Sequence, residues 1–202
     1  MRRLWLASGS PRRAQLLASI GVQVGHIIRP EIDETPLAGE VPADYVRRMA
    51  SEKAEVGWQR VAPQDLAGVA LLAADTTVVL DGQILGKPDS DEHARQMLGQ
   101  LSGREHQVLS AVTVIIDGGI EHALSESRVR FAVLSDEDIS AYVSSGEPLD
   151  KAGSYAVQGF GALFIEHLAG SYSGVVGLPL AETGRLLRQA QVPIWQQGER
   201  NE

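Results

Sequence analysis

The segment from residue 8 to residue 13 combines small residues with two arginines in a way that suits the binding of an anion. It reads Ser-Gly-Ser-Pro-Arg-Arg and follows the apolar run Leu4–Ala7. Ser10 and Pro11 are typical of a helix start, where free backbone N–H groups and the helix dipole favour negative charge. The alternative is a capped helix with two solvated arginines, whose charges would oppose the dipole. Because guanidinium groups also donate in pairs to phosphate oxygens, we expect phosphate contacts from Ser8, Ser10, Arg12 and Arg13.

Carboxylates at two other places suit metal binding or the activation of water. Asp75 follows the apolar run Val69–Ala74. We expect the strand to end there and to present the carboxylate at the edge where open α/β sheets bind their ligands. Glu34 and its neighbour Asp33 lie in an acidic, proline-punctuated loop, and clustered carboxylates suit a hard divalent cation such as Mg²⁺. The alternatives are an aspartate that caps a turn and a loop of solvated acidic residues.

The few lysines are a second source of positive charge. The chain contains three of them, Lys53, Lys87 and Lys151, against fifteen arginines. Where arginine occupies most basic positions, a remaining lysine is a candidate for a site that needs a compact ammonium charge. On a chain with a formal net charge of −8, a triphosphate requires a local basic cluster. Lys53 and Lys87 would supply it together with the arginines near the N-terminus, although each lysine on its own is also compatible with a surface position.

A single amide, Gln158, lies in the glycine-rich segment Asp150–Gly161. Small neighbours allow the backbone to approach a ligand closely. A glutamine amide can accept a hydrogen bond from a ring N–H and donate one to an adjacent carbonyl, which is the pattern on the edge of uracil and thymine. Without a ligand, the same residue would be an exposed glutamine in a loop.

Composition excludes several classes of protein. The 202 residues are 44% apolar and 22% charged, as in ordinary globular domains, and contain no cysteine. Disulfides, thiolate zinc sites and cysteine nucleophiles are therefore excluded. The acidic balance argues against a general nucleic-acid binder. No apolar run approaches the roughly 20 residues of a membrane span, so we expect a soluble cytoplasmic protein without membrane or nucleic-acid partners.

Strands and helices alternate along the chain, which favours an α/β fold with some antiparallel pairing. The expected strands span residues 4–7, 22–28, 69–74, 76–80, 83–85, 107–116, 128–134 and 162–166. The expected helices span about residues 11–20, 43–61, 89–101, 135–144 and 179–189, with capping boxes at Asp89/Glu92 and Ser135/Asp138. No repeat or linker is visible, so we expect one domain over residues 1–202 with a loose tail from about residue 191.

Five short motifs occur in order along the chain. They are Ala7–Arg13, Ala74-Asp75-Thr76, Gly86-Lys87-Pro88, Leu101-Ser102-Gly103 and Asp150-Lys151-Ala152-Gly153. Together they resemble the Maf family of nucleoside triphosphate pyrophosphatases, and the resemblance extends from Leu4 to about Leu187. It implies a mixed α/β fold, with an elongated sheet flanked by helices and two lobes around a nucleotide-binding cleft. It also implies a cytoplasmic enzyme that depends on a divalent metal and can form a homodimer.

The resemblance also implies residue roles. The sequence around Gln158 looks like the subfamily that hydrolyses dTTP and UTP to the monophosphate and pyrophosphate, with a possible role in clearing non-standard pyrimidine nucleotides. Asp75 would accept the proton of the attacking water, and Glu34 and Asp75 would hold Mg²⁺ or Mn²⁺. The positions associated with phosphate charge and base choice fall on Lys53, Lys87, Arg12, Thr76 and Gln158.

Two other functions remain open at the level of sequence. The first is a 7-methyl-GTP pyrophosphatase, which would need a stacking aromatic pair; Tyr155 and Phe160 are available, whereas Gln158 argues against it. The second is a non-catalytic nucleotide-binding regulator of septum formation. A pure binder does not need a carboxylate that activates water, so the presence of Asp75 beside the basic residues favours the enzyme.

Overall fold

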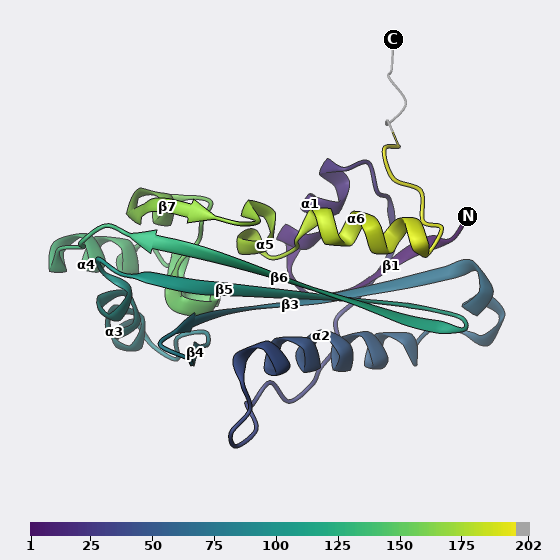
Figure 1. Cartoon of the computed structure of the whole chain (residues 1–202), viewed down its shortest axis with the longest axis horizontal. Helices are drawn as coiled ribbons and strands as arrows, with labels where there is room; N and C mark the ends of the chain where they lie inside the picture. The colour runs from purple at the N-terminus through teal and green to yellow at the C-terminus, as the bar shows by residue number, and fades with distance from the viewer. Residues whose placement is uncertain (197–202) are drawn as a thin grey trace, which may run out of the picture.

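The computed structural model describes residues 1–196 and has a mixed seven-stranded sheet at its centre (Figure 1). The strand order is β2-β1-β3-β5-β6-β7, and the short β4 pairs with β3 outside this path. The strands are β1 (Arg3–Ala7), β2 (Val24–Ile28), β3 (Val69–Leu80), β4 (Gln83–Leu85), β5 (Glu105–Ile116), β6 (Gly119–Phe131) and β7 (Ile165–Ala169). Strands β2, β1 and β3 run parallel, and all other pairs are antiparallel. The expectation of a mixed α/β fold with an elongated sheet is therefore confirmed.

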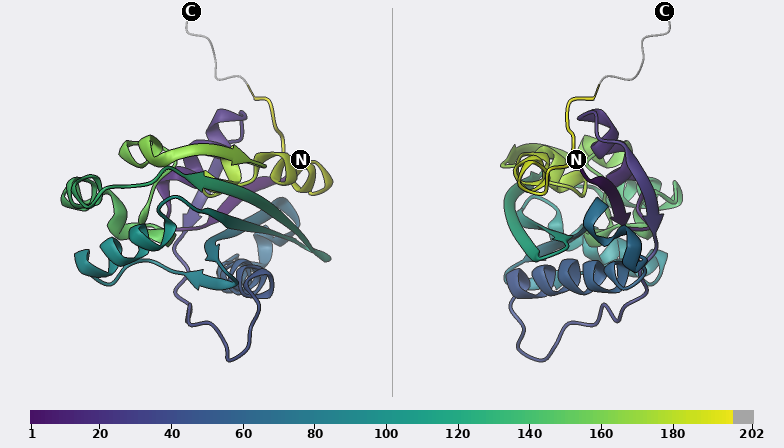
Figure 2. Two further views of the ribbon diagram at one scale, coloured as in Figure 1. Left: turned by 60° about the vertical axis from the view of Figure 1, so that its left-hand side comes forward. Right: turned by 90° about the vertical axis from the view of Figure 1, so that its right-hand side faces the viewer.

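Helices cover both faces of the sheet. They are α1 (Pro11–Ser19), α2 (Pro42–Trp58), α3 (Asp91–Leu101), α4 (Asp136–Ser144), α5 (Tyr172–Val176) and α6 (Leu180–Gln189). Four short 3₁₀ turns complete the described chain: η1 (Pro63–Gly68), η2 (Glu147–Asp150), η3 (Ala152–Ser154) and η4 (Phe160–Phe164). Helix α2 lies on one face, and α1 and α6 lie on the other (Figures 1 and 2). Within residues 1–196, no helix combines the length and apolar character needed to cross a membrane.

Strand β3 is buried on both faces because it lies between these two layers. Side chains alternate along a strand, so its odd-numbered and even-numbered residues enter different cores. Leu71 and Ala73 pack in a cluster that contains Ala54 of α2. Ala70 and Leu72 pack in the cluster built from α1 and α6. By the same alternation, residue 75 faces α2 and residue 76 faces the opposite layer.

The prediction that a strand ends at Asp75 is wrong. Strand β3 continues through this residue to Leu80, and β5 pairs with it from Ala70 to Val79 without interruption. A carboxylate in the middle of a buried strand is tolerated because Lys53 of α2 forms an ion pair with it. The two strands expected on either side of Asp75 are therefore one.

Other element boundaries also differ from expectation. Helix α3 is capped by Ser90, whose Oγ accepts from the His93 N–H, so the capping box expected at Asp89 and Glu92 is wrong. The capping box between Ser135 and Asp138 is confirmed. Strand β6 begins nine residues earlier than expected, because its polar first half, Gly119–Ser125, pairs with residues 110–116 of β5. Strand β7 lies three residues later than expected, and the single-turn helix α5 was not predicted.

The predicted C-terminal tail is packed over its first part. The Trp195 and Gln196 N–H groups donate to the carbonyls of Ile20 and Gly21, at 2.9 and 3.1 Å. Val192 is buried in the core formed with α1 and α6. This first part of the predicted tail therefore contacts the end of α1. The rest of the predicted tail, residues 197–202, lies outside the described residues.

A buried histidine lies in the core between β5 and the glycine-rich segment. His106 is 2% exposed, and its Nε2 is 2.8 Å from the Tyr155 hydroxyl. Its ring packs edge-on against Phe131 and Tyr155, and its Nδ1 has no hydrogen-bond partner within the described chain. Burial lowers the pKa of His106 from 6.5 to about 4.

This histidine makes stability depend on pH. Because the folded pKa is below the unfolded one, the unfolded chain binds an extra proton between pH 6.5 and about 4. The free energy of unfolding is therefore unaffected by titration of His106 above pH 6.5. It falls by about 3 kcal/mol in total as the pH decreases through this range. In urea unfolding from pH 7.5 to 4.5, His106→Gln should flatten the profile. The exposed control His167→Gln should leave the wild-type slope unchanged, and an equal effect of both variants would contradict the assignment.

Candidate active site

One cavity of about 650 Å³ collects the residues that the sequence singled out. All ten residues expected at the site line it: Ser8, Ser10, Arg12, Arg13, Glu34, Lys53, Asp75, Thr76, Lys87 and Gln158. They come from six separate stretches of chain, so the fold brings together what the sequence keeps far apart. This volume is in the range of small-molecule sites in proteins.

The cavity lies beside a gap along one edge of β3. On this edge β1 pairs with β3 as far as Ala73, and β4 begins to pair at Val78. Residues 74–77 therefore have no neighbouring strand on that side in the described structure. At the gap the chain leaves β1 and turns into α1. The cavity thus lies at the carboxyl end of β1, which is where parallel α/β sheets bind their ligands. Asp75 reaches it from the middle of the continuous strand β3.

The turn after β1 is held by the Ser8 hydroxyl. Its Oγ accepts from the Ser10 N–H at 3.1 Å and from Arg13 Nη1 at 3.0 Å. Arg13 Nε also donates to the Gly177 carbonyl at 2.9 Å, which ties the turn to the end of α5. Ser10 occupies the N-cap position of α1, but its side chain makes no capping bond. The N–H groups of the first turn of α1 thus have no side-chain cap and can bind an anion.

Lys53 links two carboxylates at the centre of the site. Its Nζ lies 2.7 Å from Asp75 Oδ1 and 2.7 Å from Glu34 Oε1. Lys53 and Asp75 are 8% and 9% exposed, whereas the Glu34 side chain is about half exposed. Burial raises the pKa of Asp75, despite the opposing charges of Lys53 and Arg13. Asp75 is therefore a stronger base than an ordinary surface aspartate.

Glu34 has a different electrostatic environment. Partial burial alone would raise its pKa, but the hydrogen bond and charge of Lys53, with Lys87 and Arg13 nearby, outweigh this and lower the pKa. No group of three or more His, Asp or Glu side chains converges on a metal position within residues 1–196. Glu34 and Asp75 each use one oxygen for Lys53. The pair fits Mg²⁺, which is commonly held by one or two carboxylates together with substrate phosphates.

On the opposite face of β3, the hydroxyl of Thr76 has a fixed direction. Thr76 Oγ1 lies 2.8 Å from Ser110 Oγ, and Ser110 Oγ donates to the Gly174 carbonyl at 2.6 Å. A hydroxyl has one proton, and a carbonyl can only accept. Ser110 uses its proton on Gly174, so Thr76 must donate to Ser110. Thr76 therefore offers only acceptor lone pairs to the cavity.

Glu147, which the sequence did not indicate, shapes the loop that carries Gln158. Its carboxylate accepts from the Tyr142 hydroxyl at 2.8 Å and from the N–H groups of Phe160 and Gly161 at 3.1 and 3.0 Å. Gly159 has φ +98°, and a Cβ at Gly161 would lie 2.5 Å from a backbone oxygen. The glycines after Gln158 were the available signal, because they indicate a tight backbone path.

Two further charged residues beside the cavity were not predicted as site residues. Asp150 lies 3.6 Å from Arg12 Nη1 and 2.6 Å from the Lys151 ammonium. Lys151 also donates to the Glu147 carbonyl at 2.7 Å. These contacts join the turn between β1 and α1 to the segment before Gln158. Arg12 therefore lies between this turn and the segment that leads to Gln158.

A cavity with an open helix N-terminus, a basic cluster and a paired carboxylate site suits a phosphorylated ligand. The chain belongs to the Maf family, because the family model described as Maf-like protein matches residues 3–190. A dTTP/UTP pyrophosphatase of Methylococcus capsulatus is 57% identical over 92% of this chain and 90% of that protein. Proteins of the same name from Nitrosomonas europaea and Ralstonia nicotianae are each 50% identical, over 95% of this chain and 96% and 95% of their own lengths.

The lysine bridge predicts an asymmetry in stability. Lys53→Met leaves a buried and a half-buried carboxylate without their shared cation, so the free energy of unfolding at pH 7 should fall by about 3 kcal/mol. Asp75→Asn removes a costly buried charge while Lys53 keeps Glu34, and the change should stay within about 1 kcal/mol. Urea unfolding of both variants measures the difference. Equal losses would show that the fold depends on Asp75 as much as on Lys53, and would contradict the predicted asymmetry.

Proposed function

We propose that this protein hydrolyses dTTP and UTP to the nucleoside monophosphate and pyrophosphate. The observation that carries the proposal is that three features line one cavity: the turn between β1 and α1, the two carboxylates bridged by Lys53, and the loop that carries Gln158. The relatives support it, since proteins about half identical to this chain over nearly its whole length are named dTTP/UTP pyrophosphatases.

The basic residues divide the charge of the triphosphate among several donors. The first-turn N–H groups of α1, with Arg12, face one side of the cavity, and Lys87 faces it from the segment after β4. Arg13 contributes mainly by fixing the turn, because two of its nitrogens donate to Ser8 and Gly177. Such preorganised donors stabilise charge that develops on the leaving pyrophosphate.

In the proposed reaction, water attacks the α-phosphorus, and the bond to the bridging oxygen of pyrophosphate breaks. Asp75 takes a proton from the attacking water. Because burial raises its pKa, this carboxylate is closer to the useful range of a general base at neutral pH than an ordinary aspartate. Lys53 holds Oδ1 of Asp75 and so fixes the direction of the carboxylate.

Glu34 and Asp75 are the proposed ligands of a divalent cation, Mg²⁺ or Mn²⁺. When bound, such a cation lowers the pKa of water and neutralises phosphate oxygens. The half-exposed Glu34, with its lowered pKa, remains charged at neutral pH and available for this role.

Thr76 and Gln158 together can distinguish uracil and thymine from cytosine. A glutamine amide can rotate to match either type of base edge, so it needs a second group that cannot. Thr76 is this group, because its proton is committed to Ser110 and its oxygen can only accept. In uracil and thymine N3–H can donate a hydrogen bond to the Thr76 oxygen while the Gln158 amide donates to an adjacent ring carbonyl, whereas N3 of cytosine carries no proton to donate.

The alternative substrate 7-methyl-GTP fits the cavity less well. Stacking on a cationic purine needs free aromatic faces. Tyr155 lines the cavity, but it is buried and packed edge-on against His106 and Phe131. Phe160 is largely exposed and is not among the residues that line the cavity. The aromatic pair that the alternative requires is therefore not assembled.

Pyrophosphate release from dTTP, UTP, CTP, GTP and 7-methyl-GTP, with Mg²⁺ or Mn²⁺, tests the activity. We expect release from dTTP and UTP, and we expect Asp75→Asn to lower kcat by at least about 100-fold because it removes the base. Asp117→Asn, in the exposed turn between β5 and β6, is the matched control and should retain activity. Unchanged turnover in Asp75→Asn would exclude its role, and release from 7-methyl-GTP alone would exclude the proposed substrates.

Removal of the Ser110 hydroxyl tests how the base is read. In Ser110→Ala the Thr76 hydroxyl can rotate and donate to N3 of cytosine. The ratio of kcat/KM for CTP to that for UTP should then rise about tenfold, the value of one hydrogen bond. Ser125→Ala, which removes a buried hydroxyl directly opposite Ser110 on β6, should leave the ratio unchanged. An unchanged ratio in Ser110→Ala would contradict the inference that Ser110 restricts the Thr76 hydroxyl to accepting hydrogen bonds.

A further inference from the structure

Glu34 reaches the cavity from a segment without regular secondary structure. Residues 29–41 connect β2 to α2 and contain neither helix nor strand. Within this segment the Thr35 N–H donates to Asp33 Oδ1, and the Leu37 N–H donates to Glu40 Oε2. These local bonds shape two turns, but they do not attach the segment to the rest of the fold. The position of Glu34 therefore depends on contacts with another element.

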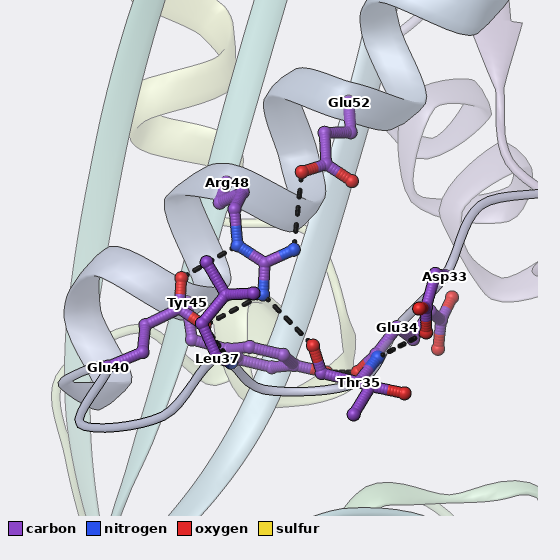
Figure 3. Close-up of polar contacts among 8 residues, drawn as sticks. All are labelled: Asp33, Glu34, Thr35, Leu37, Glu40, Tyr45, Arg48 and Glu52. Atoms are coloured by element: carbon purple, nitrogen blue, oxygen red, sulfur yellow. Dashed lines mark hydrogen bonds and ion pairs between the residues drawn. The ribbon is translucent and has the colours of Figure 1, made fainter.

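Helix α2 supplies these contacts from one stripe of its surface (Figure 3). Tyr45, Arg48 and Glu52 follow one another at three- and four-residue spacing, which places them on one side of a helix. The Tyr45 hydroxyl donates to the Glu34 carbonyl at 2.9 Å. Lys53, next to Glu52, binds the Glu34 carboxylate. One helix thus holds both the backbone and the side chain of Glu34.

Arg48 makes the largest number of polar contacts in this stripe. Its Nε and Nη2 donate to the two oxygens of Glu40, each at 2.7 Å. Nη2 also donates to the Thr35 carbonyl at 3.2 Å, and Nη1 donates to Glu52 at 3.2 Å. The guanidinium therefore connects the helix to both ends of the turn that follows Glu34 (Figure 3). Bidentate pairs of this kind fix orientation as well as distance.

We propose that Arg48 is a positioning residue that holds the carboxylate of Glu34 in the cavity through Glu40 and the Thr35 carbonyl. This inference rests on the proposed function for its effect on turnover, but not for the anchoring itself. Arg48 is not a lining residue of the cavity, so it acts on the reaction only through the segment that it holds. A displacement of about 1 Å in a catalytic group can cost about 100-fold in rate.

The geometry of the contacts explains why this position needs arginine. Glu40 keeps its carboxylate only 8% exposed, and the hydrogen bond from Arg48 lowers the pKa of Glu40 to about 2. A lysine ammonium cannot donate along two parallel directions to Glu40 and also reach Thr35 and Glu52. Arg48→Lys should therefore keep the charge and restore only part of the anchoring.

Amide hydrogen exchange tests the anchoring without any assay of activity. In Arg48→Gln, exchange at Thr35 and Leu37 should accelerate at least about tenfold, because loss of the charge-assisted bonds frees the turn. Arg48→Lys should give a smaller increase. Arg47→Gln is the matched control: Arg47 is adjacent on α2, is about half exposed, and within residues 1–196 forms an ion pair only with Asp44 on the same helix. Equal exchange in Arg48→Gln and wild type would overturn the proposal.

A double-mutant cycle then tests whether Arg48 acts through Glu34. Arg48→Gln should lower kcat/KM for dTTP about 30-fold, with partial rescue in Arg48→Lys and no change in Arg47→Gln. In a Glu34→Gln background, the same substitution should cost less than about threefold. If the two effects multiply, or if kcat/KM is unchanged while exchange accelerates, Arg48 does not position Glu34 for the reaction. If the wild-type protein hydrolyses no nucleotide, the proposed function fails, and amide exchange still decides whether Arg48 anchors the segment.

Discussion

The two ion pairs of Lys53 are the interaction on which the site depends. A carboxylate in the middle of a buried strand is costly unless a cation compensates it, and the Lys53 ammonium does so for Asp75 at 2.7 Å. The same ammonium binds Glu34. Helix α2, strand β3 and the irregular segment that carries Glu34 therefore meet at the Lys53 ammonium. Burial raises the pKa of Asp75 although Lys53 opposes the shift, so the basicity of the site is a balance between burial and the ion pair that permits it.

The gap in the sheet gives this charge cluster access to a ligand. Strand β3 is covered on its far edge by β5 along most of its length, but on the near edge β1 stops at Ala73 and β4 starts at Val78. Asp75, Thr76 and Thr77, which lie in this uncovered stretch, line the cavity. The turn from β1 into α1 brings its uncapped helix start to the same place. A central strand can thus carry functional side chains that strands normally carry only at their ends.

The sequence predicted the mixed α/β fold, most elements and all ten cavity-lining candidates, because small residues, carboxylates and rare lysines mark chemistry locally. It failed where neighbours in space decide the outcome. Asp75 looked like the end of a strand, since nothing nearby in sequence reveals Lys53 as its partner. Glu147 and Arg48 were missed for a related reason: their partners are mainly backbone groups and side chains brought close only by the fold. Whether the Thr76 hydroxyl can donate to a ligand likewise depends on Ser110, which lies 34 residues away in the sequence.

The alternation of side chains along β3 has an evolutionary consequence. Asp75 and Thr76 are neighbours in the chain, but they project to opposite faces of the sheet and contact different partners, Lys53 on one side and Ser110 on the other. If Thr76 and Gln158 read the base as proposed, mutations in the layer around Ser110, Gly174 and the Gln158 loop can change which base is accepted without disturbing the charged cluster beneath α2. A lineage built on this sheet can diversify in substrate preference while its hydrolytic apparatus stays under separate selection.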